Sequence, residues 1–237
     1  KPRLSTEALA AIAALTAQDW LALEALADLG MIPATLLDAN VYGSRAVRKR
    51  RFHVMHRAGV AELFRLPAGR RGQVSFTRLG PVGKRALAAR GRSLGAAHER
   101  LEMCCAVAPE HARLIAEAYF LARRLTADGG GRLSWAPLPQ APAGAWAVAR
   151  LEAPEGGAAE IALVADGLPW SPSEVATWLR DSKRRAGVLV TTDPARGAER
   201  ARAVDSEGRR FVAKRPAEAI AVAWGRLSQA APAPRPY

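Results

Sequence analysis

Residues 44–87 read SRAVRKRRFHVMHRAGVAELFRLPAGRRGQVSFTRLGPVGKRAL, and this stretch decides the fold of the N-terminal part of the chain. Its first fifteen residues contain six Arg or Lys, two His and no acidic residue. Ser44 is a typical N-cap and Gly59 a typical helix terminator, so the pattern predicts one basic helix between them. Apolar residues at 60–66 and 73–77, on either side of PAGRRG, predict a β-hairpin with a basic tip.

The segments around this stretch extend the pattern. LTAQDWLALEALADLG (15–30) has apolar residues at helical spacing, with Thr16 as N-cap and Gly30 as the stop. A short helix is expected at about 34–39, and GPVGKRALAARG (80–91) begins another helix after the hairpin. The order helix, helix, helix, strand, tip, strand, helix is the layout of a winged helix-turn-helix.

Two parts of this stretch carry a family resemblance. HRAGVAELFRL (56–66) and VSFTRLGPVGKRAL (74–87) resemble the segment in which bacterial winged-helix regulators end the recognition helix and return through the wing. MarR-like and PadR-like regulators share it, and so does the replication-relaxation family, to which the length and element order are most similar. The resemblance covers roughly residues 15–90. It implies a DNA-binding winged domain followed by a C-terminal α/β region similar to restriction-endonuclease-like folds.

The charge of the chain is concentrated in the same region. The whole chain has a formal net charge of +13 and a pI near 11.0. Residues 43–92 contain fourteen Arg or Lys against one acidic residue, Glu62, so the entire surplus lies in fifty residues. A codon bias toward Arg would not concentrate the excess in this way. The distribution therefore predicts a polyanionic partner.

The predicted contacts to DNA lie on the basic helix and the hairpin. A period of 3.6 residues places Phe52 and Met55 inward with Arg48 at their edge, and places Arg50, His53 and Arg57 outward. Arginines on that face can bind guanine or phosphate, and the two-Arg tip suits phosphates or a narrow minor groove. The candidate DNA-binding residues are Ser44, Arg45, Arg48, Lys49, Arg50, His53, Arg57, Arg70, Arg71, Arg78, Lys84 and Arg85.

Beyond residue 92 the pattern predicts two further regions. Helices at about 94–107 and 109–126 serve either as a bundle packed on the winged domain or as the dimerisation helices of a homodimer, and both options stay open. TADGGGRLSWAPLPQAPAGA (126–145) is expected to be a linker because it is rich in Gly and Pro. Two strands at 145–152 and 159–166 form a predicted hairpin.

The end of the chain has clear local signals. SPSEVATWLRDSKRR (171–185) is predicted to be a helix, with Ser171 at the N-cap and Glu174 closing a capping box. Strands follow at 187–192 and 209–215, and a last helix follows at 216–227, so a parallel pair of strands is expected. The prediction is an α+β protein. Its parts are a winged helix-turn-helix domain at 1–92, a helical connector at 93–128, a small α/β domain at 129–227 and a disordered tail at 228–237.

No catalytic set is recognised in the C-terminal region. A nuclease of the implied type needs an Asp on one strand and an acid-x-Lys motif on the next. GAWAVARLE (144–152) lacks an Asp, and Glu160 is followed two residues later by Ala162 instead of Lys. Cys104 and Cys105 are adjacent, and with four scattered His they do not form a zinc ligand set. We therefore expect no enzyme activity, no metal and no cofactor.

The sequence thus predicts a double-stranded DNA-binding protein, either a transcriptional regulator or a plasmid or chromosome replication-maintenance factor. Two alternatives remain open: a Mg²⁺-dependent DNA-processing enzyme that uses the α/β domain, and a winged-helix module that contacts proteins. No run of 18 apolar residues occurs, and the N-terminal segment lacks a clean cleavage site. The expected location is cytoplasmic, on the nucleoid, with no membrane association.

Overall fold

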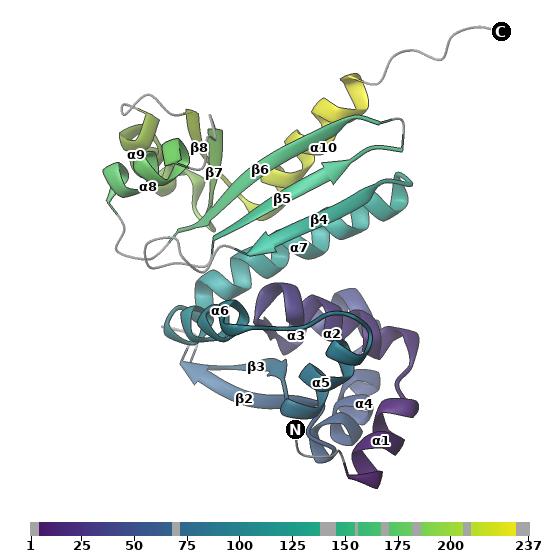
Figure 1. The fold of residues 1–237 in the computed structure, drawn as a ribbon. Helices are drawn as coiled ribbons and strands as arrows, with labels where there is room; N and C mark the ends of the chain where they lie inside the picture. Colours follow the sequence, from purple (N-terminus) through teal and green to yellow (C-terminus); the bar gives the residue numbers. More distant parts are fainter. Residues whose placement is uncertain are drawn as a thin grey trace, which may run out of the picture. The chain divides into compact units, whose positions relative to one another are not determined.

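The computed structural model describes residues 5–67, 72–137, 146–154, 156–166, 171–181, 186–205 and 210–230. The chain divides into two compact units, residues 1–113 (unit 1) and 114–237 (unit 2). Unit 1 combines helices with a small antiparallel sheet, and unit 2 contains a mixed five-stranded sheet with helices (Figure 1). The α+β class predicted from the sequence is therefore confirmed.

Unit 1 alternates helices with short strands. Its elements are α1 (Thr6–Ala13), α2 (Ala17–Leu29), β1 (Met31–Pro33), α3 (Ala34–Leu37), the π-helical turn η1 (Asp38–Tyr42), α4 (Arg45–Arg57), β2 (Ala61–Pro67), β3 (Gln73–Leu79), α5 (Pro81–Ala89), α6 (Ala96–Val107) and the first turn of α7 (Pro109–Asp128).

The helix ends follow the local signals in the sequence. Thr16 and Asp19 form a reciprocal capping box at the start of α2, and Gly30, at φ +73°, ends that helix. The Ser44 hydroxyl accepts a hydrogen bond from the Val47 amide at the start of α4. Gly59 takes φ +67° just after α4, a conformation that favours glycine. These predicted boundaries are confirmed.

The sheet of unit 1 has the strand order β1-β3-β2, and both pairs are antiparallel. β2 and β3 form the predicted hairpin, with Phe64 opposite Phe76 and their rings stacked at a centroid distance of 6.4 Å. Phe76 also joins a buried cluster with Leu101 and Cys105, so α6 packs against this sheet. Of the two roles predicted for this helix, packing on the N-terminal unit is thus observed for α6.

Two glycines allow α5 to approach the end of α4 and the start of β2. A Cβ atom on Gly80 would lie 2.2 Å from the carbonyl oxygen of Gly59, and one on Gly83 would lie 2.2 Å from that of Val60. The Val82 amide donates a hydrogen bond of 3.0 Å to the Gly59 carbonyl. The Gly-x-x-Gly spacing at the start of α5 therefore fixes how closely this helix packs against the hairpin.

Unit 2 begins within α7 and continues as a sheet with crossing helices. Its further elements are β4 (Arg132–Pro137), β5 (Trp146–Glu152), β6 (Ala158–Ala165), α8 (Pro172–Asp181), β7 (Ala186–Val190), α9 (Pro194–Asp205), β8 (Arg210–Lys214) and α10 (Pro216–Ala230). The strand order is β4-β5-β6-β7-β8. Strands β4 to β6 are antiparallel and strands β6 to β8 are parallel. The predicted hairpin, the parallel pair and the Ser171–Glu174 capping box are confirmed.

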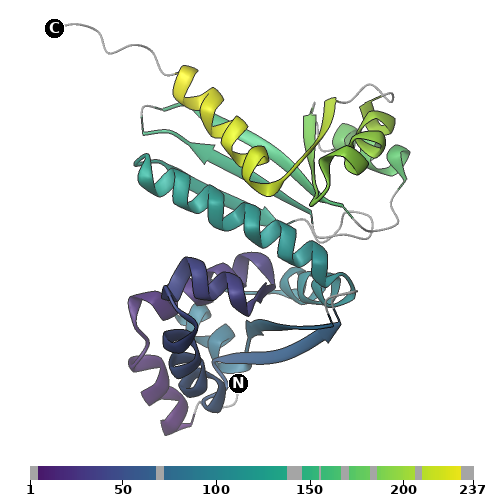
Figure 2. The ribbon, with the colours of Figure 1, turned by 180° about the vertical axis from the view of Figure 1, so that it is seen from behind.

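The central strand β6 is covered on both faces, because residues 161–165 are all buried. Helices α8 and α9 pack on one face in a cluster that includes Val164, Val175 and Leu189. Helices α7 and α10 lie across the opposite face (Figure 2). The Tyr119 and Trp135 rings join α7 to β4 edge to face, at 5.1 Å.

One predicted segment is wrong over part of its length. Residues 126–145 were expected to form a linker, but α7 continues to Asp128 and residues 132–137 form the edge strand β4. Residues 138–145 lie outside the described residues. The predicted connector, 93–128, is divided between the two units, and α10 extends to Ala230.

None of the helices in the described ranges is by itself long and apolar enough to cross a membrane. One bent pair, α1 with α2, reaches the required length and composition only when the two are taken together.

Candidate nucleic-acid interface

Helix α4 packs its apolar side against unit 1. Phe52 and Met55 are buried, and the Phe52 ring meets Tyr42 edge to face at 5.8 Å. At the C-terminal end, His56 Nδ1 lies 3.3 Å from the Ala61 carbonyl oxygen, which links the helix to β2. The predicted inward face is confirmed.

The opposite face of α4 is basic and exposed. Arg45, Lys49, Arg50, His53 and Arg57 all have exposed side chains. Among the described residues, no ion pair or side-chain hydrogen bond involves any of these five. Four positive charges and an imidazole therefore lie on one side of one helix, with no counter-charge from the part of the chain that the structure describes.

Arg48 and Arg51 differ from these residues, because each has a carboxylate partner inside the fold. Residues 44–58 contain no acidic residue, and both partners come from other elements. Arg48 is only 6% exposed, and its Nε lies 2.5 Å from Asp38 Oδ1. The Arg51 guanidinium forms a salt bridge with Asp19, which is fully buried. Arg48, a candidate DNA ligand, is therefore held inside the fold by Asp38.

The Asp19 carboxylate collects hydrogen bonds from three sides. It accepts from the Thr16 amide and hydroxyl, both at 2.8 Å, from the Tyr42 hydroxyl at 3.1 Å, and from Arg51. Burial alone would raise the pKa of this carboxyl, but the hydrogen bonds from Arg51 and Thr16 outweigh burial and lower the pKa below its usual value. Burial and the Asp19 charge together raise the pKa of Tyr42.

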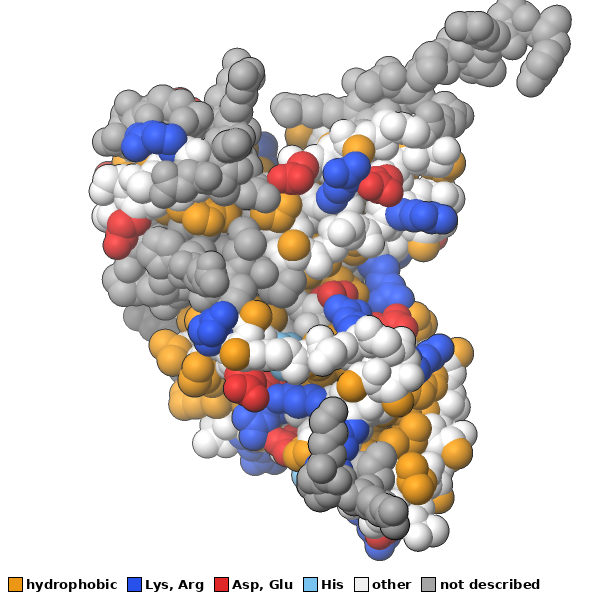
Figure 3. Space-filling view, in the orientation of Figure 1, with side chains coloured by type: hydrophobic (Ala, Val, Ile, Leu, Met, Phe, Trp, Pro, Cys, Tyr) orange, Lys and Arg blue, Asp and Glu red, His pale blue; other side chains and the backbone are white. Residues whose placement is uncertain are grey.

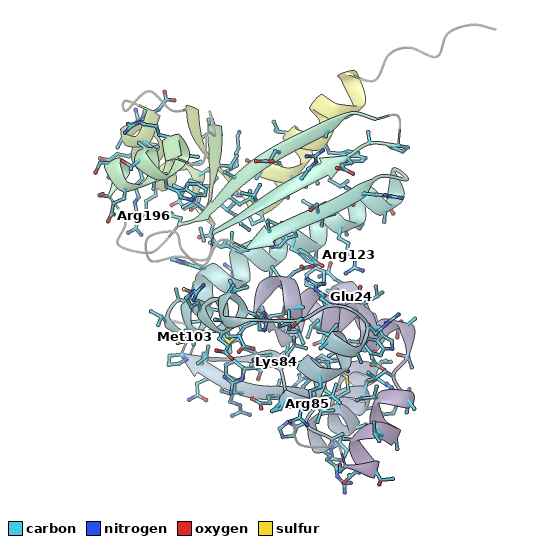
Figure 4. The ribbon with its side chains drawn as sticks, in the orientation of Figure 1. Glu24, Lys84, Arg85, Met103, Arg123 and Arg196 are labelled. Carbon is cyan, nitrogen blue, oxygen red and sulfur yellow. The ribbon has the colours of Figure 1, made fainter. Side chains whose placement is uncertain are left out.

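Two of the candidates on β3 and α5, Arg78 and Lys84, have carboxylate partners. Arg78 pairs with Glu62 at 2.8 Å and lies over the Phe64 ring at 5.4 Å from its centroid. Lys84 pairs with Glu102 at 2.8 Å, and Arg85 is the next residue of α5 and is exposed (Figure 4). Basic and acidic side chains are interleaved over this side of unit 1 (Figure 3). Arg78 and Lys84 are therefore less available to an anion than the exposed cations of α4.

Glu102 also faces a buried histidine. His98 Nε2 lies 3.2 Å from Glu102 Oε1, and His98 Nδ1 lies 3.2 Å from the Ala27 carbonyl oxygen. Burial would raise the pKa of Glu102, but hydrogen bonds from His98 and Lys84 lower it below the usual value. This cluster joins α2, α5 and α6 inside unit 1.

One basic residue of the hairpin was missed as a candidate. Arg65 is exposed on β2, opposite Ser75, and shares the exposed face of the strand with Leu63 and Pro67, whereas Phe64 and Leu66 between them are partly buried. No ion pair involves Arg65 among the described residues. The alternation of exposed and covered positions in this strand was the available signal. Arg70 and Arg71, the predicted wing tip, lie outside the described residues.

Two acidic residues of unit 2, Asp166 and Glu152, take part in internal contacts. Asp166, at the end of β6, accepts hydrogen bonds from Thr191 at 2.9 Å and from Arg200 at 2.7 Å. Arg150, opposite Glu160 in the sheet, pairs with Glu152. In the described ranges no three His, Cys, Asp or Glu side chains are grouped so that they could hold a metal ion.

The two adjacent thiols occupy different environments in α6. Cys105 is buried and donates to the Leu29 carbonyl, and burial raises the pKa of its thiol to about 12. Cys104 is partly exposed. A thiol with so high a pKa remains protonated at neutral pH and is a poor nucleophile.

Comparison with known proteins gave no match: no family model fits the chain, and no curated protein or solved structure resembles it significantly.

Proposed function

We propose that residues 17–89 form a winged helix-turn-helix and bind double-stranded DNA, with α4 as the recognition helix. The order α2, β1, α3, α4, β2, β3, α5 and the sheet order β1-β3-β2 support this assignment. The observation that carries the proposal is the set of four exposed cations on α4, Arg45, Lys49, Arg50 and Arg57, none of which has an ion pair within the described ranges.

Helical geometry arranges these cations in two rows. At about 100° per residue, Arg45 and Lys49 lie on one side of the exposed face, and Arg50 and Arg57 lie on the other. Ala46 and His53 lie between the two rows. The major groove is about 12 Å wide, similar to the diameter of a helix with its side chains. In this arrangement the rows bind phosphates of the two strands, while Ala46 and His53 face the base edges.

The start of α4 adds a second attraction for anions. The first helical turn carries no acidic residue and begins with Arg45. The partial positive charge of a helix N-terminus repels a nearby cation, so this arrangement is unfavourable within an isolated protein. A phosphate near the Ser44 cap offsets both charges.

The hairpin is proposed as the second contact. Arg65 is exposed on β2, and Arg70 and Arg71 belong to the predicted tip. We propose that they bind the backbone or the adjacent minor groove and so contribute affinity without sequence preference.

We propose that unit 2 mediates interactions rather than catalysis. The whole chain then acts as a regulator or a replication-maintenance factor. Its helix, three-strand meander, helix and parallel strand follow the order expected of a degenerate restriction-endonuclease-like domain. The substitution of Ala162 for the required Lys supports a non-catalytic role. Incubation with supercoiled plasmid and Mg²⁺ tests this assignment, and nicking that is lost on Glu160→Ala would overturn it.

The central test is a selection of bound sequences from a random duplex pool, followed by fluorescence anisotropy on the best duplex between 50 and 200 mM salt. We expect saturable binding that weakens steeply with salt. Polyglutamate of matched charge serves as competitor. Binding that polyglutamate displaces as effectively as duplex would instead favour an acidic protein as the partner of this surface.

A further inference from the structure

Helix α4 is held in place by Asp19, a carboxylate whose negative charge is unfavourable for binding DNA. Asp19 is fully buried, yet it contacts three elements: Thr16 at the start of α2, Tyr42 at the end of η1, and Arg51 in the middle of α4. The Arg51 guanidinium reaches further and donates to the Ala14 carbonyl oxygen at 2.9 Å. One side chain thus sets the position of α4 relative to both preceding segments.

A second pair acts on the same face of the helix. Arg48 bonds Asp38 and lies 5.9 Å from the centroid of the Phe52 ring. Arg48 and Arg51 are three residues apart, so both anchors lie on one side of α4, opposite the exposed cations. The six cations of the segment therefore divide into two that fix the helix and four that face outward.

Stability alone gives little reason for this arrangement. Replacing a buried ion pair by well-packed apolar residues is often neutral or stabilising, whereas the pair has a defined geometry that apolar contacts lack. A negative charge beneath a DNA-binding helix also opposes the attraction of phosphates. Both considerations would favour an uncharged residue at position 19 if the residue served only to stabilise the fold.

We propose that Asp19 is a positioning residue for DNA binding: through Arg51 and Tyr42 it orients α4 so that its four exposed cations meet the duplex together. This inference rests on the proposed function and adds a residue that touches no DNA. It predicts a change in duplex affinity opposite in sign to the change expected from net charge alone. Removing this negative charge weakens binding, although it makes the protein more cationic.

Asp28 provides a matched control. It lies in the same helix as Asp19 and forms a salt bridge with an arginine, Arg92, which lies outside α4. Asp28→Asn and Asp19→Asn remove the same charge from the same element, and each breaks one Arg–Asp pair. The net charge of the chain therefore changes equally in both variants, and the arginine that loses its carboxylate partner belongs to α4 only in Asp19→Asn.

The experiment compares duplex binding by the full chain at 100 mM salt, at a temperature where circular dichroism shows each variant to be folded. We expect Asp19→Asn to bind about tenfold more weakly than wild type and Asp28→Asn to bind as tightly or slightly more tightly. Hydrogen exchange gives a second readout, in which the α4 amides of Asp19→Asn exchange faster and those of Asp28→Asn do not.

Tyr42→Phe keeps the proposal testable if Asp19→Asn fails to fold. This variant preserves the ring contact with Phe52 and every charge, and removes only the hydrogen bond to Asp19. We expect about threefold weaker binding. If the folded Asp19→Asn or Tyr42→Phe binds duplex as tightly as Asp28→Asn, the positioning role is wrong while DNA binding stands. If wild type binds no duplex, the proposed function itself fails.

Discussion

Replacing two exposed cations of α4 tests the proposed interface most directly. Arg50→Gln with Arg57→Gln removes one of the two rows while keeping side-chain length and polarity. Both residues are exposed and lack an ion pair within the described ranges, so the change breaks no internal contact there. Any loss of duplex binding then reports on the contact with DNA rather than on the fold.

The size of the effect follows from the number of cations. Each phosphate contact contributes about 0.9 to the slope of log K against log salt. If all four exposed cations of α4 bind phosphates, these contacts by themselves lower the wild-type affinity about 150-fold when the salt is raised from 50 to 200 mM. The double variant retains two of them, which by themselves lower its affinity about 12-fold over the same range, and its slope is smaller by about 1.8 whatever the hairpin contributes.

The assay is fluorescence anisotropy of one duplex at several salt concentrations. A matched control is Arg196→Gln with Arg202→Gln, two exposed arginines of α9 in unit 2, of which Arg196 is labelled in Figure 4. This control removes the same net charge and is expected to keep the wild-type slope. Equal slopes for the α4 variant, the control and wild type would refute the assignment of α4 as the DNA-binding surface.

Three further outcomes are expected. His53→Ala should change the preferred sequence in a random-pool selection while leaving the salt slope nearly unchanged, since the proposed role of His53 is at base edges; an unchanged preference would argue against that role. Gly83→Ala should lower the free energy of unfolding by about 1–3 kcal/mol in urea titrations, because its Cβ overlaps the Val60 carbonyl oxygen, whereas Gly225→Ala, where a Cβ has no neighbour within 4 Å, should raise it by about 0.5–1 kcal/mol. Folding lowers the pKa of Asp19. The contribution of this carboxylate to stability is therefore present above the unfolded-state pKa, near 3.8, and is lost as the pH falls through the folded-state pKa. Urea midpoints measured from about pH 6 to 3 should thus fall less steeply for Asp19→Asn than for wild type.

Local signals were sufficient for most elements of the fold. Helix ends at Thr16, Gly30 and Ser44 depend on contacts within three or four residues, which a sequence pattern contains. The edge strand β4 was missed because Arg132–Pro137 lies among Gly and Pro residues, which outweighed the alternation of Leu133 and Trp135 with Arg132 and Ser134. Its pairing with β5 and the packing of Trp135 on Tyr119 hold it in the sheet, and both are tertiary contacts.

The sequence indicated which segments carry the candidate site but not which of their cations are exposed. The concentration of cations in 43–92, and their placement on one helix and one hairpin, are properties of the sequence alone. Whether a cation is paired or free to meet a ligand depends on which carboxylates lie close to it in the folded structure. Asp38 is ten residues from Arg48, and Asp19 is 32 residues from Arg51. Helical periodicity places a side chain on a face, but only the packing of α2 and η1 against α4 neutralises two charges and leaves four exposed, because ion pairing depends on distance through space rather than along the chain.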